Sequence, residues 1–345
     1  MIPQSPERDV LSHSTVQEVL SFKRDIHMYI DVGKDDSIST ALKLMLEGDV
    51  LSLPVYEESG GKRKYVDLVT IEDIRNHIIS WDGLDDEIKH QELGGKSRGP
   101  TVLEEPVSNI VSKPHSKPPV ISINSSLDEL LALFSECRRH RVLVNMSEGD
   151  ESPPVSLTQS DLLRFLNHNN HKFGAYFDLA VSEIAKLQGA SAIVSDNSSH
   201  LATIKIRETA LNGFQKLRDL HLGALGILDG DGRLVTELAG TSLRWLTEDK
   251  INLLGRPVLA YLFGLNCSIS APYICRKEFT ISQVTMGLLR TKARRAWILD
   301  SMNRPIGVIT LNDLLSVFQT SPQQTVASSR MNIQSYAART IKNAH

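Results

Sequence analysis

One order of apolar and polar stretches occurs four times along the chain, and it limits the fold more than any other feature. Each copy begins with a short apolar strand and an amphipathic helix of about three turns, followed by two apolar strands and a second helix. The copies end in the segments 66–75, 155–164, 234–244 and 306–315. Because a β-α-β-β-α unit of this size cannot cover both of its apolar faces alone, we expect the copies to pair.

The repeat predicts an α/β fold, and the length of 345 residues is enough for about two domains. We expect repeats at 12–82, 107–168, 178–248 and 255–318, followed by a flexible tail over 319–345. The polar stretch 167–172 is placed as the boundary between two paired modules.

Three copies share a Thr-x-x-Asp motif where the last strand meets the last helix. The pairs are Thr70/Asp73, Thr158/Asp161 and Thr310/Asp313. In one interpretation each pair is close to a capping box, in which the two side chains satisfy free backbone amides at the helix start. In the other, the ionised carboxylate accepts hydrogen bonds from the vicinal hydroxyls of a ribose. The third copy has Ala239 and Ser242 at these positions and therefore lacks the acid.

Clusters of cations precede the middle strand in two copies. They are Arg138-Arg139-His140-Arg141 in the second copy and Lys292-Ala293-Arg294-Arg295 in the fourth. Arginine suits phosphate because its planar fork matches two oxygens, but cations at a helix end also complement the helix dipole. The first copy has Leu51-Ser52 at this place.

The fourfold pattern with its strand-Thr-x-x-Asp-helix endings resembles cystathionine-β-synthase-type (CBS) domains in two tandem pairs. The arrangement is similar to the γ subunit of AMP-activated protein kinase and to γ-like proteins of plants and fungi. The resemblance implies a disk of four repeats that binds AMP, ADP or ATP in clefts between paired repeats. It assigns the ribose to the three Thr/Asp pairs and the phosphates to His140/Arg141 and, by position, to Arg294/Arg295. Leu51-Ser52 replaces the His-Arg pair in the first copy, so we expect its site to be weak, altered or empty. Because the third copy lacks the acid, we expect at most three occupied sites.

Other kinds of function find little support in the sequence. The formal charge of −3 argues against a nucleic-acid binder that works by bulk charge. Three cysteines are too few for a disulfide framework or a zinc cage, and we expect no metal site. The Walker-type loop, the His-Glu-x-x-His motif and the Gly-x-Ser-x-Gly elbow are absent, so we expect no enzyme. Neither a secretory leader nor a membrane span is evident, which favours a cytoplasmic or nuclear protein.

The sequence thus predicts a regulatory, γ-like subunit or sensor that binds an adenine nucleotide and modulates a protein kinase. The alternative is a four-CBS scaffold that binds no nucleotide and regulates a phosphatase or a stress-signalling partner. The degenerate third copy and Leu51-Ser52 favour this alternative. The partner subunits and the state of self-association, monomer or homo-oligomer, stay open at this point.

Overall fold

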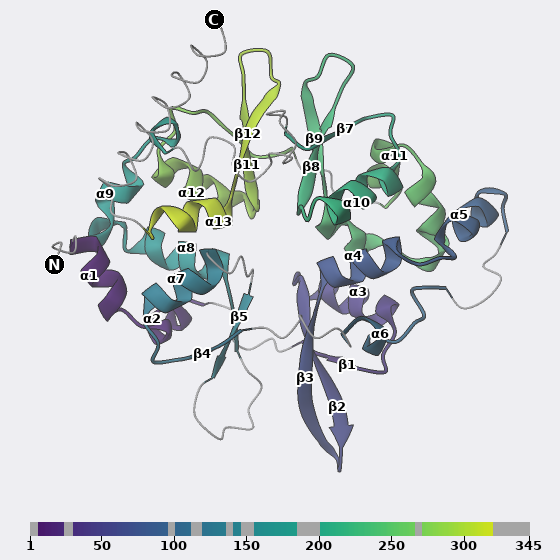
Figure 1. Cartoon of the computed structure of the whole chain (residues 1–345), viewed down its shortest axis with the longest axis horizontal. Helices are drawn as coiled ribbons and strands as arrows, with labels where there is room; N and C mark the ends of the chain where they lie inside the picture. The colour runs from purple at the N-terminus through teal and green to yellow at the C-terminus, as the bar shows by residue number, and fades with distance from the viewer. Residues whose placement is uncertain are drawn as a thin grey trace, which may run out of the picture. The chain divides into compact units, whose positions relative to one another are not determined.

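The fold is described from a computed structural model of the chain (Figure 1). It describes residues 6–23, 30–95, 101–111, 119–135, 141–145, 155–184, 201–265 and 271–319. His140 and the expected tail from residue 320 onward lie outside these residues. The chain divides into two compact units. One contains repeats 2 and 4 and is called the 2/4 unit, and the other contains repeats 1 and 3 and is called the 1/3 unit.

Each repeat forms its own three-stranded sheet, as the sequence predicts. The first strand runs parallel to the second, and the second pairs antiparallel with the third. The strands are β1 (Val32–Gly33), β2 (Ser52–Ser59) and β3 (Lys62–Thr70) in repeat 1, β4 (Val120–Ser122), β5 (Arg141–Asn145) and β6 (Val155–Thr158) in repeat 2, β7 (Thr203–Lys205), β8 (Ala224–Leu228) and β9 (Leu234–Ala239) in repeat 3, and β10 (Ile274–Cys275), β11 (Arg295–Leu299) and β12 (Pro305–Thr310) in repeat 4.

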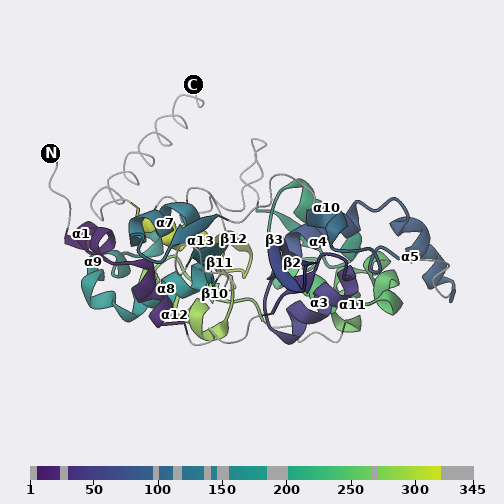
Figure 2. The same ribbon diagram turned by 90° about the horizontal axis from the view of Figure 1, so that it is seen from below.

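Two helices complete each repeat, one after the first strand and one after the third. They are α3 (Ile38–Glu47) and α4 (Ile71–Ile79) in repeat 1, α7 (Leu127–Ser135) and α8 (Gln159–His168) in repeat 2, α10 (Ala210–Asp219) and the 3₁₀ helix η4 (Gly240–Trp245) in repeat 3, and α12 (Ile281–Thr291) and α13 (Leu311–Val317) in repeat 4. In the 2/4 unit α13 packs on α7 and α8, and α12 also packs on α8, a grouping visible in Figures 1 and 2. In the 1/3 unit α4 packs on α10 and η4.

The last helix of repeat 3 is a 3₁₀ helix because its start lacks the capping residues of the other repeats. Ala239 has no side-chain oxygen to accept from the first turn, and the Ser242 hydroxyl donates to the Ala239 carbonyl oxygen instead. A first turn without a cap is less stable as an α-helix. The sequence identifies this copy as degenerate, and the structure shows the local consequence.

Short helical segments that precede the repeats dock on a different repeat from the one that follows them. An isolated β-bridge fastens each segment to the start of a repeat's first helix: Thr15 to Ser126, Pro106 to Ser37, Ala180 to Thr280 and Pro257 to Thr209. The segments are α2 (Val16–Ser21), α6 (Ser108–Val111), η2 (Val181–Glu183) and α11 (Val258–Gly264). Thus α2, which precedes repeat 1, docks on repeat 2, and α6, which precedes repeat 2, docks on repeat 1. The same exchange relates η2 and α11 to repeats 4 and 3.

The remaining helical elements connect these parts. They are α1 (Pro6–His13), α5 (Leu84–Glu92), η1 (Asn170–Lys172), α9 (Gly174–Phe177) and η5 (Glu248–Gly255). Helix α1 packs on α7, α5 packs on η5, and α9 packs on α12.

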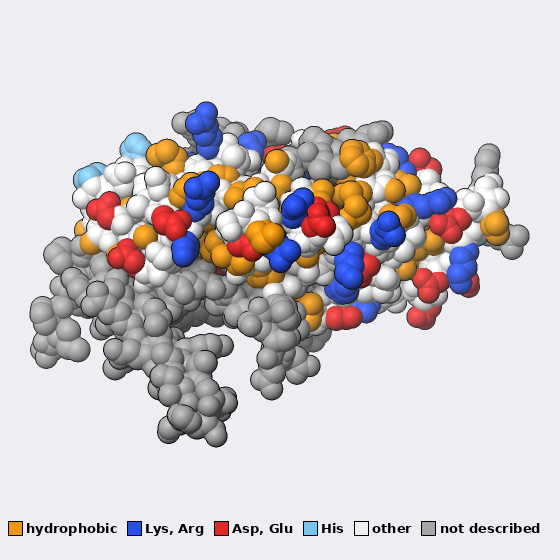
Figure 3. All heavy atoms as spheres, turned by 90° about the horizontal axis from the view of Figure 1, so that it is seen from above, with side chains coloured by type: hydrophobic (Ala, Val, Ile, Leu, Met, Phe, Trp, Pro, Cys, Tyr) orange, Lys and Arg blue, Asp and Glu red, His pale blue; other side chains and the backbone are white. Residues whose placement is uncertain are grey.

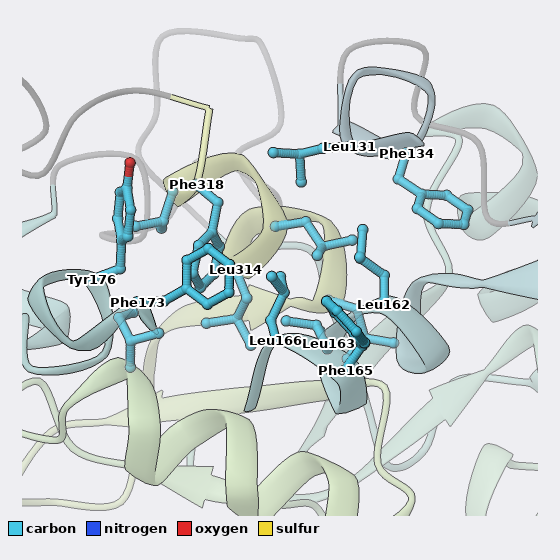
Figure 4. Packing of buried hydrophobic residues seen from close by; sticks show 14 of the residues in the cluster. Leu131, Phe134, Leu162, Leu163, Phe165, Leu166, Phe173, Tyr176, Leu314 and Phe318 are labelled. Carbon is cyan, nitrogen blue, oxygen red and sulfur yellow. The ribbon is translucent and has the colours of Figure 1, made fainter. Parts of the chain in front are cut away.

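An aromatic cluster holds the connecting segment 170–177 on repeat 4. Phe318 lies with its ring centroid 6.1 Å from that of Phe173 and 4.9 Å from that of Tyr176 (Figure 4). Its centroid also lies 5.4 Å from that of Phe177. All four rings are buried. The polar stretch 167–172 therefore does not separate the two compact units, contrary to the expectation from its composition, because the aromatic residues after it pack inside the 2/4 unit.

Candidate functional site

All three Thr/Asp pairs form a reciprocal cap at the start of the last helix of their repeat. In repeat 4 the Thr310 hydroxyl accepts from the Asp313 amide at 3.3 Å. The Asp313 Oδ2 accepts from the Thr310 amide at 2.8 Å and from its hydroxyl at 2.7 Å. The pairs Thr70/Asp73 and Thr158/Asp161 repeat this geometry. The capping interpretation is thus realised in the structure. The cap engages Oδ2 of each aspartate. In the ribose interpretation, the other carboxylate oxygen would accept from the ribose.

Strand register places an arginine beside the capping threonine in repeats 2 and 4. Arg141 is the direct partner of Thr158 across β5 and β6, and Arg295 is the direct partner of Thr310 across β11 and β12. Directly opposed residues on neighbouring strands have side chains on the same face of the sheet. Each of these repeats therefore brings a guanidinium and a capped carboxylate to one end of its sheet, while Arg294, one residue before β11, is exposed.

The other two repeats replace this arginine. Ser52 is the partner of Thr70 in repeat 1, and Ala224 is the partner of Ala239 in repeat 3. The Ser52 hydroxyl is buried and makes no hydrogen bond within the described part of the chain. Repeat 1 thus keeps the acid without the arginine, and repeat 3 has neither. The correspondence of Leu51-Ser52 with His140-Arg141, predicted from the sequence, agrees with this register.

The aspartates of repeats 1 and 2 have opposite electrostatic surroundings. Oδ2 of Asp161 lies 3.7 Å from Nζ of Lys23, and Oδ1 of Asp161 lies 3.1 Å from Nη1 of Arg164. Asp73 has no ion pair with any described residue, and Glu72 and Asp67 lie near it. Burial raises the pKa of Asp73, with the two neighbouring acids adding to the increase and the bonds from Thr70 opposing it.

This difference predicts a pH-dependent effect of Asp73→Asn. A carboxyl whose pKa is higher in the folded than in the unfolded chain contributes stability at low pH, and the contribution is lost as the pH rises through the folded pKa. At pH 7 the variant, which cannot ionise, should therefore melt at a higher temperature than the wild type. The difference should shrink as the pH falls toward the ordinary value of 3.8. Melting curves at several pH values test this, and a lower midpoint for the variant at pH 7 would contradict it.

Sequence reasoning missed two arginines, one buried and one partly buried, that link repeats 1 and 3 inside the 1/3 unit. Arg75 on α4 is 3% exposed and donates from Nη1 to the Leu222 carbonyl at 3.0 Å. Arg244 on η4 occupies the equivalent position of repeat 3 and donates to the Val50 carbonyl at 3.3 Å. The 2/4 unit has Leu163 and Leu315 there, both fully buried. The only sequence signal for the two arginines is their position: Arg75 lies two residues after Asp73, and Arg244 lies two residues after Ser242.

The described residues offer little chemistry of other kinds. No cluster of acids, histidines or cysteines with metal-binding geometry occurs among them. Cys275 is buried, which raises the pKa of its thiol to about 12 and makes it a poor nucleophile. No helix in the described ranges is both long and apolar enough to span a bilayer. On the face seen in Figure 3, basic and acidic side chains are interspersed.

Comparison with protein families identifies one of the repeats directly. The family model for the CBS domain matches residues 25–80, which comprise β1, α3, β2, β3 and α4. Residues 25–80 form a CBS domain. Because the other three sheets repeat its strand order and helix positions, the chain has the fold of tandem CBS repeats. Among curated proteins, none matches the sequence.

Among solved structures, that of protein MJ1225 supports the same fold for the chain as a whole. Protein MJ1225 from Methanocaldococcus jannaschii, described as a proposed archaeal homologue of γ-AMPK, superimposes with a TM-score of 0.65 at 14% identity. The match covers 88% of this chain and all of MJ1225. An uncharacterised protein from Pyrococcus horikoshii gives a TM-score of 0.47 at 19% identity, covering 77% of this chain and 90% of its own. CBSX2 in complex with AMP matches 45% of this chain and 98% of its own, with a TM-score of 0.30 and 19% identity.

Proposed function

We propose that the chain is a regulatory protein that binds an adenine nucleotide, AMP, ADP or ATP, at the capped ends of repeats 2 and 4. The observation that carries the proposal is the register that sets Arg141 beside Thr158 and Arg295 beside Thr310. A ribose offers two adjacent hydroxyl donors for a carboxylate, and its phosphate offers oxygens for a guanidinium. Both groups stand at one sheet end in these repeats. A scaffold without ligands would need only the caps.

The proposal ranks the repeats by what they supply. Repeat 4 has Asp313, which is 8% exposed, and Arg295. Repeat 2 has the equivalent pair, and His140 adds a further donor in the proposal. Repeat 1 offers a carboxylate without the arginine, so it should favour a ligand with little negative charge. Repeat 3 should stay empty.

Regulation would follow from linkage between the ligand and a partner. A nucleotide that binds two arrangements of the repeats with different affinity shifts their populations, and a partner that prefers one arrangement senses the shift. In the proposal the partner is a protein kinase, with subunits like those of AMP-activated protein kinase, in the cytoplasm or nucleus. A role without catalysis is part of the same proposal.

A thermal-shift panel tests the proposed function. A ligand that binds only the folded chain must raise the melting midpoint, by an amount that grows with its concentration. We expect AMP, ADP or ATP at about 100 times its dissociation constant to contribute roughly 2.7 kcal/mol. GMP and inorganic phosphate serve as controls for the base and the charge. An unchanged midpoint with all three adenine nucleotides would contradict the proposal.

Arg295→Met should separate phosphate recognition from ribose recognition. Removing the guanidinium leaves Asp313 and its cap in place, so adenosine affinity should be unchanged while ATP affinity falls about tenfold. Titration calorimetry with adenosine, AMP and ATP measures the ratio. Arg304→Met, in the turn between β11 and β12, is a matched control from the same repeat. Equal losses for adenosine and ATP would contradict the assignment of Arg295 to the phosphate.

The second candidate function is a scaffold without nucleotide that binds a phosphatase or stress-signalling partner. The absence of both acid and arginine in repeat 3 favours it, because at least one repeat has kept the fold without the proposed site. The same thermal-shift panel distinguishes the two candidates.

A further inference from the structure

The segment that precedes repeat 1 is held firmly on repeat 2 by backbone and side-chain contacts. The amides of Val16 and Gln17 donate to the carbonyls of Ser125 and Ile123 at 2.9 and 3.0 Å. Val16, Val19 and Leu20 are buried in the core of the 2/4 unit. These contacts fix the direction in which α2 ends.

Phe22 continues this docking at the end of α2. Its ring centroid lies 5.5 Å from that of Phe165 with the planes nearly perpendicular, and 4.6 Å from the ring of His168. Both partners lie on α8, the helix that Thr158 and Asp161 cap. The residue that follows Phe22 is therefore brought to the same repeat as the proposed ribose carboxylate.

That residue is Lys23, and its ammonium reaches the capped end of repeat 2. Lys23 Nζ donates to the carbonyl oxygen of Ser156 on β6 and lies 3.7 Å from Asp161 Oδ2. The Lys23 side chain is 19% exposed and that of Asp161 is 11% exposed. An ammonium at this depth interacts more strongly with the carboxylate than a surface lysine would.

The other cation at Asp161 is easier to displace. Arg164 pairs with Oδ1 from the next turn of α8, and its side chain is 46% exposed, so it can swing into water. Lys23 would lose both the Ser156 carbonyl and the carboxylate if it moved away. Asp73, by comparison, has no such cation within the described ranges. Of Asp73 and Asp161, only Asp161 pairs with a described residue from a distant part of the chain.

We propose that Lys23 is an internal competitor for Asp161, which lowers the nucleotide affinity of repeat 2. The inference rests on the proposed function, because it concerns the same carboxylate. A ribose hydroxyl that donates to Oδ2 of Asp161 must replace the ammonium. One that donates to Oδ1 must replace Arg164 and meets a carboxylate whose charge the ammonium already partly neutralises.

The experiment measures AMP affinity by titration calorimetry with the full chain carrying Asp73→Asn and Asp313→Asn, which leaves repeat 2 as the site to be read. In this background the Lys23→Met variant should bind AMP roughly tenfold tighter than the chain that keeps Lys23. Methionine keeps the apolar part of the lysine side chain and removes the ammonium. Lys23→Arg, which keeps the charge, should bind as weakly as Lys23. Adding Asp161→Asn should abolish the gain. Lys216→Met, which breaks an ion pair with Glu208 in the 1/3 unit, is the matched control and should change nothing.

Each result decides between the two proposals. If the Lys23→Met variant and the chain that keeps Lys23 bind AMP equally, the competitor role is overturned. If Asp313→Asn in the otherwise unchanged chain still weakens AMP binding, the proposed function stands. Weaker binding by Lys23→Met makes Lys23 a nucleotide ligand and also overturns the competitor role. No AMP binding by any variant, including the unchanged chain, overturns both. If the double background does not fold, the same comparison in the unchanged chain reports the affinity and number of sites.

Discussion

Asp313→Asn should weaken AMP binding by the chain roughly 30-fold, about 2 kcal/mol, at the site of repeat 4. Asp313 is 8% exposed, and its Oδ2 already accepts from the amide and hydroxyl of Thr310. In a site with so little water, a hydrogen bond from a ribose hydroxyl to a charged oxygen contributes more than one to a neutral amide. Asparagine keeps an oxygen for the cap, so the fold should be retained.

Titration calorimetry with AMP measures this loss, and the melting midpoint of each variant reports on folding. Asp300→Asn provides a control in the same repeat, since Asp300 accepts from the amides of Met302 and Arg304 in the turn before β12. Affinity should stay within twofold of the wild type in this control, roughly 0.4 kcal/mol. An affinity for AMP that Asp313→Asn leaves unchanged would show that the carboxylate serves the helix cap alone.

Arg75→Ala should destabilise the 1/3 unit by about 3 kcal/mol. Truncation removes a side chain that is 3% exposed and leaves the Leu222 carbonyl without its guanidinium donor, so a cavity and an unpaired acceptor add together. Burial lowers the pKa of Arg75, which shows that holding its charge in the core has a cost. Arg75→Met, which fills the space without the charge, should therefore lose less than Arg75→Ala.

Denaturant unfolding of the full chain measures these differences. Arg233→Ala is the matched control, because Arg233 lies in the 1/3 unit with a side chain that is 52% exposed and an ion pair to Asp231. Its effect should stay within about 0.5 kcal/mol. If Arg75→Ala matches Arg233→Ala, the guanidinium does not hold the two repeats together.

Much of the fold could be predicted from the sequence because it depends on local patterns. Strands and helices alternate with clear periods, and the Thr/Asp pairs mark helix starts through contacts three residues apart. The placement of Arg141 and Arg295 beside the capping threonines follows from hairpins within single repeats. These are interactions that a short window of sequence contains.

The rest could not be predicted because it depends on contacts between distant residues. Lys23 and Ser156 are 133 residues apart, and Arg75 and Leu222 are 147 apart. Nothing near Lys23 indicates that α2 leaves the repeat it precedes and docks on another. The shared apolar spacing of Val16/Val19 and Val181/Ile184 could have marked the docking segments as a further repeated element, though not their targets.

A crystal structure of the full chain with AMP tests the central claim most directly. We predict that the ribose hydroxyls lie within hydrogen-bond distance of the Asp313 carboxylate and that the phosphate contacts the Arg295 guanidinium. AMP bound elsewhere, with Asp313 contacting only Thr310, would contradict the account.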